Sequence, residues 1–178
     1  MRRIMALGLA AVLGFGAFAM DGEQLYKTYC AGCHQETGEG IPGQYPFIDG
    51  PVARLSAFPE GREFLIATVL FGLQGEMMQR GYVYNGVMPG FKDILKDEDV
   101  AALLNWMLEE WSSRAQRRRG AAVPYQPDEV AQVRALNLTP EQVMDLMRKV
   151  EEVMHGPAGN TGQGPGQGRG KGRGRGGK

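Results

Sequence analysis

The sequence predicts a single, mostly helical domain with one small β-hairpin, followed by a helical extension. Apolar residues recur at helical spacing, or at the density of a buried helix, in residues 60–73, 97–118 and 139–154. Residues 76–79 and 82–85 flank Arg80-Gly81, which is the pattern of a short hairpin. A chain of 178 residues holds one domain of ordinary size with appendages and is too short for two typical domains.

The first residues have the features of a secretory signal peptide. Arg2 and Arg3 precede an apolar run that reaches Met20, and Ala17-Phe18-Ala19 has the small-x-small pattern of a signal peptidase site. We therefore expect residues 1–19 to be a signal peptide and the protein to be exported to the periplasm or the outer face of the cytoplasmic membrane. Retention of the apolar run as an N-terminal anchor stays open, because its length is at the lower limit for crossing a bilayer.

The segment after the signal peptide combines a short helix with a long loop. Residues 21–34 are expected to form a helix that Asp21 caps, with the chain's two cysteines at its end. Residues 35–59 contain four glycines and four prolines, which predicts an irregular loop. A loop of this length in a compact domain needs something else to supply its core.

The second half of the chain has clearer helix signals. Asp97 is expected to cap a helix that runs to about Arg118, whereas residues 86–90 should break regular structure. Residues 127–136 predict a short helix. The next helix should begin at Thr139, with Gln142 as its capping-box partner.

Charge divides the chain into an acidic body and a basic tail. Residues 156–178 contain five basic and no acidic side chains, whereas residues 20–155 contain 13 basic and 20 acidic ones, a net charge of −7. An acidic protein should be steered toward a basic docking face on its partner. The tail has no large hydrophobe and should be disordered, with weak contacts to an anionic membrane surface. Export argues against nucleic acid as its partner.

These boundaries predict four parts. We expect a signal peptide in residues 1–19, the core domain in residues 20–119, a helical extension packed on the core in residues 120–155, and the disordered Gly/Arg-rich tail in residues 156–178.

The motif Cys30-Ala31-Gly32-Cys33-His34 is the C-x-x-C-H signature of c-type haem attachment. Cysteines three apart on one helical turn project to the same side, where each thiol can add to one vinyl group of a haem. The adjacent histidine then lies over the ring and can bind the iron. Three alternatives are a lone disulfide, half of a zinc site and a thioredoxin-like redox pair. The zinc site would need two more ligands, and the redox pair a βαβ setting that the sequence does not predict.

Met88 is the best candidate for the sixth iron ligand. Methionine with histidine is the ligand pair of electron-transfer cytochromes. Met88 lies in a Gly/Pro-rich segment that can approach a flat ring closely, whereas the methionines of the predicted helices suit core packing. Met77 and Met78 remain competitors.

Together these features resemble a class I c-type cytochrome: CAGCH, a Gly/Pro-rich loop, NGVMPGF and a following helix, within residues 21–113. Within that family, several segments resemble the small soluble Thermus-type cytochromes c that donate electrons to a ba-type terminal oxidase. These segments are CAGCHQETGEGIPG, GREFLI, FGLQG, YNGVM and LTPEQV. The resemblance implies an all-α class I fold around one covalent haem c, in which the N-terminal helix crosses the last core helix. The hairpin would precede the methionine loop.

The resemblance also implies roles for individual residues. Cys30 and Cys33 would hold the haem, and His34 and Met88 the iron. The Pro46 carbonyl would accept the imidazole N–H of His34, and Ile48 would pack on the ring. Gly22 and Tyr26 would meet Trp106 where the two helices cross. Phe47 departs from the family, which often has a second proline at this position.

The implied function is electron transfer and not catalysis. The protein would carry single electrons between a quinol-oxidising complex and a terminal oxidase in a respiratory chain, as a monomer. An alternative is a cytochrome c subunit or domain partner of a periplasmic dehydrogenase complex. A haem-based sensor would need an open sixth position, which Met88 disfavours.

Overall fold

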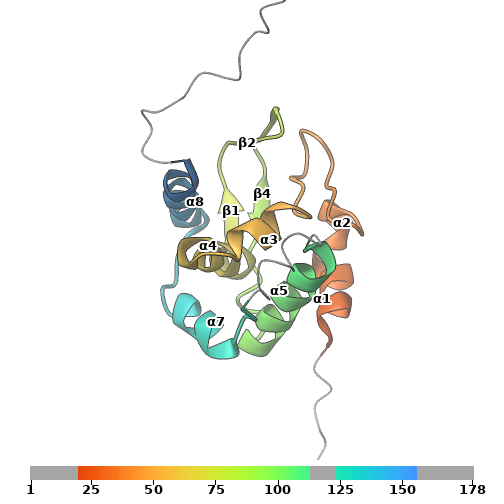
Figure 1. The fold of residues 1–178 in the computed structure, drawn as a ribbon, viewed down its shortest axis with the longest axis vertical. Coiled ribbons are helices and arrows are strands. Elements are labelled where there is room, and N and C mark those ends of the chain that lie inside the picture. The colour runs from red at the N-terminus through yellow and green to blue at the C-terminus, as the bar shows by residue number, and fades with distance from the viewer. Residues whose placement is uncertain (1–19, 113–122, 156–178) are drawn as a thin grey trace, which may run out of the picture.

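The computed structural model describes residues 20–112 and 123–155. Its helices are α1 (Gly22–Tyr29), α2 (Ala31–His34), α3 (Pro51–Leu55), α4 (Pro59–Phe71), α5 (Asp97–Trp111), α7 (Pro127–Arg134) and α8 (Pro140–His155). Its strands are β1 (Gly72–Gln74), β2 (Met77–Gln79), β3 (Tyr82–Tyr84) and β4 (Val87–Pro89). Helices dominate, as the sequence predicts, and the strands form two small antiparallel pairs near the centre and top of Figure 1. The signal-peptide and tail predictions lie outside the described residues.

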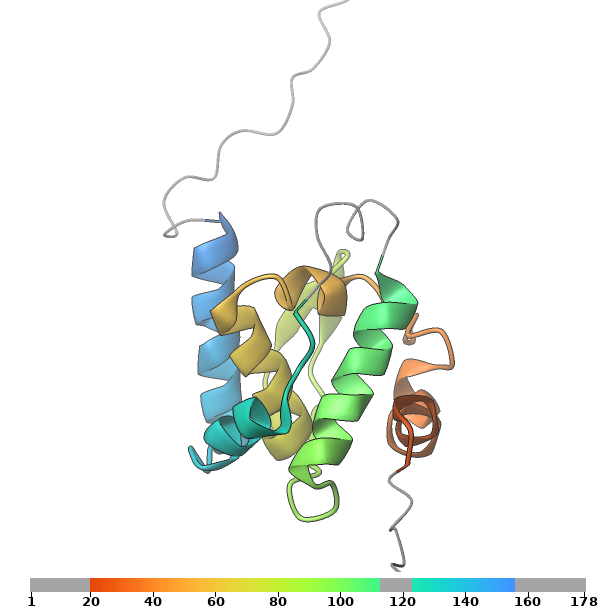
Figure 2. The same ribbon diagram turned by 60° about the horizontal axis from the view of Figure 1, so that its bottom comes forward.

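Helices α1 and α5 pack against each other, and Figure 2 shows them side by side. The Asp21 side chain accepts a 2.8 Å hydrogen bond from the Gln24 N–H, so Asp21 caps α1 as predicted. Tyr26 is fully buried, and its ring centre lies 5.0 Å from that of Trp106. A Cβ added at Gly22 would lie 2.3 Å from the carbonyl oxygen of Ala102. The helices therefore meet at Gly22 and Tyr26, as the resemblance implies.

We expect Gly22→Ala to lower the free energy of unfolding by about 1–3 kcal/mol, because the new methyl group must push α1 away from the α5 backbone. Gly32→Ala is the matched control, since a Cβ at Gly32 would meet no atom within 4 Å. Denaturant unfolding of both variants measures the difference. Equal stability of the two variants would mean that the crossing tolerates a side chain.

The loop predicted for residues 35–59 contains a helix that the sequence analysis missed. Pro51 begins α3, and Val52, Ala53 and Leu55 are buried. Proline suits the first turn of a helix because its missing N–H has no helical partner there. The density of glycine and proline concealed this five-residue element.

The prediction that residues 86–90 lack regular structure is wrong. Val87–Pro89 forms β4, which pairs antiparallel with β1, and Met88 lies opposite Leu73. A Cβ at Gly72 would lie 2.2 Å from the Met88 carbonyl oxygen, so the strands approach closely where Gly72 has no side chain. The partner strand lies more than ten residues earlier, and local sequence patterns cannot show such a pairing.

The predicted hairpin is confirmed. Strands β2 and β3 pair with Met77 opposite Tyr84 and Gln79 opposite Tyr82. Arg80 and Gly81 form the turn between them, with φ angles of 52° and 82°. Positive φ at both central residues identifies the tight turn type that matches the twist of a hairpin.

Helix α5 begins and ends differently from the prediction. Its N-cap is Lys96, whose N–H donates to the Asp99 carboxylate at 3.0 Å. The helix ends at Trp111, and the extended backbone of Ser112 breaks it. The Ser112 hydroxyl bonds back to the Leu108 carbonyl, and such local bonds compete with the helix. Residues 113–118, the rest of the predicted helix, lie outside the described residues.

Tyr125 attaches the beginning of the helical extension to the core. It is 1% exposed, and its hydroxyl lies 2.7 Å from the Ser56 hydroxyl. The Asn105 side chain accepts from the Tyr125 N–H at 2.7 Å and donates to the Tyr125 carbonyl at 3.0 Å. The backbone and side chain of Tyr125 are thus both held by the core.

Two arginines extend this attachment. Arg62 of α4 donates two hydrogen bonds to the Glu129 carboxylate, at 2.7 and 2.6 Å, and its guanidinium carbon lies 3.9 Å from the centre of the Tyr125 ring. Arg134 of α7 donates to Asp97 at 2.7 Å. Asp97 was predicted to cap α5, and in the structure it instead binds this arginine.

Helix α8 covers α4 and β1, and Figure 2 shows it along one side of the molecule. The Thr139 N–H donates to the Gln142 side chain at 2.8 Å, and the Gln142 N–H donates to the Thr139 hydroxyl at 3.3 Å. This reciprocal pair is the predicted capping box. Val143 and Val150 are almost fully buried, so the apolar face of α8 belongs to the same core as α4.

Burial raises the pKa of the Tyr125 phenol from 10.0 to about 12, and the Ser56 hydrogen bond and the Arg62 charge lower it in part. Because the folded-state pKa lies above the unfolded value, this contribution to stability is complete below about pH 10 and is lost as the pH rises toward about 12.

We therefore expect Tyr125→Phe to be less stable than the parent at neutral pH by about 1 kcal/mol, the usual contribution of one hydrogen bond. The gap should narrow between about pH 10 and pH 12, because only the parent has a phenol to ionise at this position. Denaturant unfolding across this range measures the gap. A gap that stays constant contradicts the prediction.

Candidate haem site

Cys30 and Cys33 lie on one turn at the junction of α1 and α2. The N–H groups of Cys33 and His34 both donate to the Cys30 carbonyl, at 3.1 and 2.9 Å, which fixes the turn. Cys30 is buried, Cys33 is exposed, and neither is in a disulfide. Burial, with a smaller effect of Cys33, raises the pKa of the Cys30 thiol to about 12, so this thiol is neutral at physiological pH.

His34 is held in one orientation and is 9% exposed. Its Nδ1 lies 2.8 Å from the Pro46 carbonyl oxygen. A carbonyl only accepts, so Nδ1 carries the proton and Nε2 keeps a free lone pair. Burial lowers the pKa of His34 and the Pro46 bond raises it in part, so the imidazole favours its neutral form. A neutral imidazole with one nitrogen anchored and the other free is suited to bind a metal.

The loop that supplies the Pro46 carbonyl is fixed by backbone hydrogen bonds. The Gly40 N–H donates to the His34 carbonyl at 2.9 Å, and the Ile48 N–H donates to the Gly38 carbonyl at 2.7 Å. Gly40 has a φ of 63°, and a Cβ there would lie 2.4 Å from the Tyr45 carbonyl oxygen. Ile48 is partly buried against the core.

Met88 comes from a different element. It is partly buried on β4, near the centre of Figure 1, whereas α2 with His34 lies at the right. The competing Met78 is 73% exposed on the hairpin, and Met77 is half-buried opposite Tyr84. The structure thus joins Cys30, Cys33, His34 and Pro46 by direct bonds along one segment, and Met88 is positioned separately by its pairing with β1.

The residues fit a haem. Two unpaired thiols share one turn with a buried, neutral histidine whose Nε2 is free. Two buried side-chain oxygens of the described residues, Thr68 Oγ1 and Gln79 Oε1, have no hydrogen-bond partner. Buried polar atoms are normally paired, so these two are exceptions among the described residues. Among the described residues no three or more His, Cys, Asp and Glu side chains form a cluster that could hold a metal ion.

Sequence reasoning missed the contacts of Arg80. Its guanidinium carbon lies 3.2 Å from the centre of the Phe47 ring, and its Nη2 lies 3.6 Å from Asp49 Oδ1. The contacts join the hairpin to the loop that follows the Pro46 carbonyl. The sequence did contain one indication of a special role for Arg80: an arginine occupies a turn position where asparagine or glycine is usual.

Comparison with known proteins supports this interpretation of the site. The cytochrome c family model matches residues 19–111. A cytochrome c-552 of Thermus thermophilus is 43% identical over 145 residues, which cover 80% of this chain and 95% of that protein. Another cytochrome c-552 of Thermus thermophilus is 45% identical over 130 residues, 73% of this chain and 96% of that protein.

A third relative is a subunit of an enzyme complex. The cytochrome c subunit of the quinone alcohol dehydrogenase of Gluconobacter oxydans is 30% identical over 106 residues, which cover 59% of this chain and 21% of that subunit. The family match covers more than half of the chain and includes the C-x-x-C-H motif, and the two cytochromes c-552 match over nearly their full lengths. This chain therefore belongs to the cytochrome c family as a class I c-type cytochrome, an electron-transfer protein that carries one covalent haem c.

Proposed function

We propose that this protein is an exported single-electron carrier in which Cys30 and Cys33 attach the haem and His34 and Met88 bind its iron. The arrangement of His34 supports this most strongly, because the ring is buried, neutral and anchored through Nδ1 beside two unpaired thiols. The haem supplies a one-electron Fe(III)/Fe(II) couple. The protein residues would bind and orient the group, with His34 and Met88 holding its iron.

Each proposed ligand has a defined task. The Pro46 carbonyl fixes the ring plane of His34 and makes Nε2 a stronger donor. The thioether of Met88 is an uncharged ligand that raises the reduction potential, and pairing of β4 with β1 limits its movement. Ile48, partly buried two residues after Pro46, is proposed to pack on the haem ring.

We propose that the donor is a membrane quinol-oxidising complex and the acceptor a terminal oxidase, with the carrier acting as a monomer in the periplasm or at the outer face of the membrane. Residues 20–155 have a net charge of −7, which favours a basic docking face on each partner. No helix in the described ranges has the length and apolar character needed to cross a membrane. Residues 1–19 are proposed to direct export.

The organisation proposed for the chain follows the same boundaries as the sequence analysis. Residues 20–119 form the cytochrome c domain and residues 120–155 the helical extension. The hydrogen bonds of Tyr125 and the ion pairs of Arg62 and Arg134 support packing of the extension on the core. Residues 156–178 are proposed to act only in weak contacts with an anionic membrane surface.

Covalent attachment is the first expected outcome. Mass spectrometry of the mature protein should find the mass of one haem added to the chain, and acid acetone should fail to extract it. Cys30→Ala and Cys33→Ala should each leave at most one thioether bond, since each thiol adds to one vinyl group. Release of free haem from the unmodified protein would contradict the attachment.

The carrier function is tested with purified ferrous protein and membrane vesicles from the organism that makes it. We expect oxygen-dependent oxidation of the protein that terminal-oxidase inhibitors abolish, at a rate that falls as salt screens the acidic body over about 8–10 Å. Oxidation that neither the inhibitor nor added salt slows would contradict a terminal oxidase as the acceptor.

The relative from a quinone alcohol dehydrogenase supports one alternative, a cytochrome c subunit of a periplasmic dehydrogenase complex. Affinity purification of the tagged full-length chain under low salt distinguishes the two functions. A stoichiometric complex with a dehydrogenase subunit supports the alternative, whereas a monomer that exchanges electrons in free solution supports the carrier.

A further inference from the structure

The β2–β3 hairpin is weakly held everywhere except at its base and its turn. Strands β2 and β3 pair only with each other among the described strands. Met78, Tyr82 and Val83 are each at least half exposed, whereas Tyr84 at the base is buried. An isolated two-stranded hairpin is marginally stable in water, so its position depends on contacts outside the pair.

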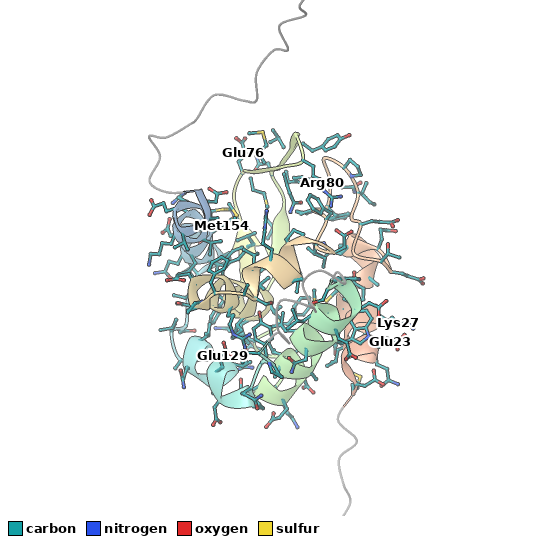
Figure 3. The ribbon with its side chains drawn as sticks, in the orientation of Figure 1. Glu23, Lys27, Glu76, Arg80, Glu129 and Met154 are labelled. Atoms are coloured by element: carbon teal, nitrogen blue, oxygen red, sulfur yellow. The ribbon has the colours of Figure 1, made fainter. Side chains whose placement is uncertain are left out.

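Arg80 provides such a contact at the turn. Figure 3 shows Arg80 beside the loop that follows α2. Its guanidinium stacks over Phe47, with 3.2 Å between its central carbon and the ring centre, and its Nη2 lies 3.6 Å from Asp49 Oδ1. A cation over an aromatic face and a carboxylate beside it both attract this side chain.

The surface that receives Arg80 is fixed. The Pro46 carbonyl, directly before Phe47, accepts the bond from His34. Directly after Phe47, the Ile48 and Asp49 N–H groups both donate to the Gly38 carbonyl, at 2.7 and 3.2 Å. The Asp49 carboxylate also accepts from the Gly50 N–H at 2.9 Å. The hairpin is therefore the movable partner in this contact.

The backbone of Arg80 adopts a conformation that favours other residue types, so its side-chain contacts must offset a local strain. Its φ is 52°, in the left-handed region where asparagine and glycine are favoured and a long side chain is uncommon. Strained positions of this kind gather at sites where a specific contact compensates for them. Asparagine would suit the turn better but could not reach Phe47.

We propose that Arg80 is a positioning residue that closes the hairpin onto the Phe47–Asp49 segment and thereby holds Met88 in place. Only Asn85 and Gly86 separate β3 from β4, so a hairpin that swings outward pulls on the strand that carries Met88. With the hairpin closed, the His34 side and the Met88 side of the site are joined by a direct side-chain contact. The inference rests on the ligand set given under Proposed function.

Displacement of the methionine from the ferric, full-length holoprotein tests the proposal. The probe is imidazole, which is mostly neutral at mildly alkaline pH, so that a change in protein charge does not steer it. The limiting rate at saturating imidazole reports how often the methionine leaves the iron. We expect Arg80→Asn and Phe47→Leu to raise this rate by about threefold to tenfold, the range that a surface cation–π contact and an exposed ion pair can supply.

Three comparisons exclude other causes of a faster displacement of the methionine. Arg148→Gln removes a positive charge from an exposed ion pair on α8 and should leave the rate unchanged. The double variant Arg80→Asn/Phe47→Leu should be no faster than the faster single variant, because one contact is lost in each case. The melting temperature of Arg80→Asn should equal or exceed that of the parent, since asparagine suits the turn, which rules out general unfolding.

The outcomes distinguish the positioning role of Arg80 from the ligand set of His34 and Met88. If the parent shows the methionine charge-transfer band and Arg80→Asn keeps the parent's rate, the role of Arg80 is refuted while the ligand set stands. If the effects of Arg80→Asn and Phe47→Leu on the displacement rate add up in the double variant, the two residues act independently and the contact between them is refuted. If the parent lacks the charge-transfer band, the ligand set is wrong, and the proposed role of Arg80 is then wrong as well.

Discussion

Met88→Ala is expected to abolish the weak charge-transfer band of the ferric protein and to lower the reduction potential by on the order of 0.1 V, within the ~0.8 V that axial ligands span in haem proteins. The physical reason is the loss of the thioether, which favours ferrous iron. The vacated position would also admit carbon monoxide in the reduced state. Optical titration at controlled potential measures both effects in one sample.

Met78→Ala and Met77→Ala are the controls for this experiment. Met78 is 73% exposed and Met77 lies opposite Tyr84 on the hairpin, whereas Met88 alone belongs to the strand that pairs with β1. We expect both controls to keep the band and the potential. If one of them loses the band while Met88→Ala keeps it, the assignment of the sixth ligand is wrong.

Tyr125→Ala is expected to lower the free energy of unfolding by about 3–5 kcal/mol, the usual cost of removing a fully buried aromatic side chain. The variant loses the packing of a ring that is 1% exposed, its hydrogen bond to Ser56 and its contact with Arg62. The haem spectrum of the folded variant should be unchanged, because Tyr125 is bonded to Ser56 and Asn105 and to none of the proposed ligands. Denaturant unfolding followed by haem absorbance gives both results.

Tyr82→Ala is the matched control, since Tyr82 is half exposed and surface substitutions usually change stability by about 0.5 kcal/mol or less. If Tyr125→Ala lowers the free energy of unfolding by less than about 1 kcal/mol, the packing of the helical extension depends little on Tyr125.

The sequence predicted the helices and caps that depend on neighbouring residues. The capping box of Thr139 and Gln142 and the cap at Asp21 involve residues three apart, and the Arg80-Gly81 turn involves two adjacent residues. Such local chemistry is visible in a window of a few residues. The same holds for the C-x-x-C-H motif, whose cysteines and histidine occupy one helical turn.

Several of the errors occurred where residues distant in the sequence determine the structure. Pairing with β1 makes Met88 part of a strand, although its neighbours favour a loop. Asp97 binds Arg134, which follows it by 37 residues, and so does not cap α5. Arg80 reaches Phe47 across more than thirty residues. Contacts of this range leave no periodic pattern in the sequence.

The most direct test of the central claim is the optical spectrum of the reduced, purified protein with and without carbon monoxide. A covalent haem with His34 and Met88 on its iron predicts a low-spin c-type spectrum that carbon monoxide leaves unchanged. A high-spin spectrum, or one that shifts on addition of carbon monoxide, would show an open or weakly held sixth position and would contradict the account of this protein as an electron carrier.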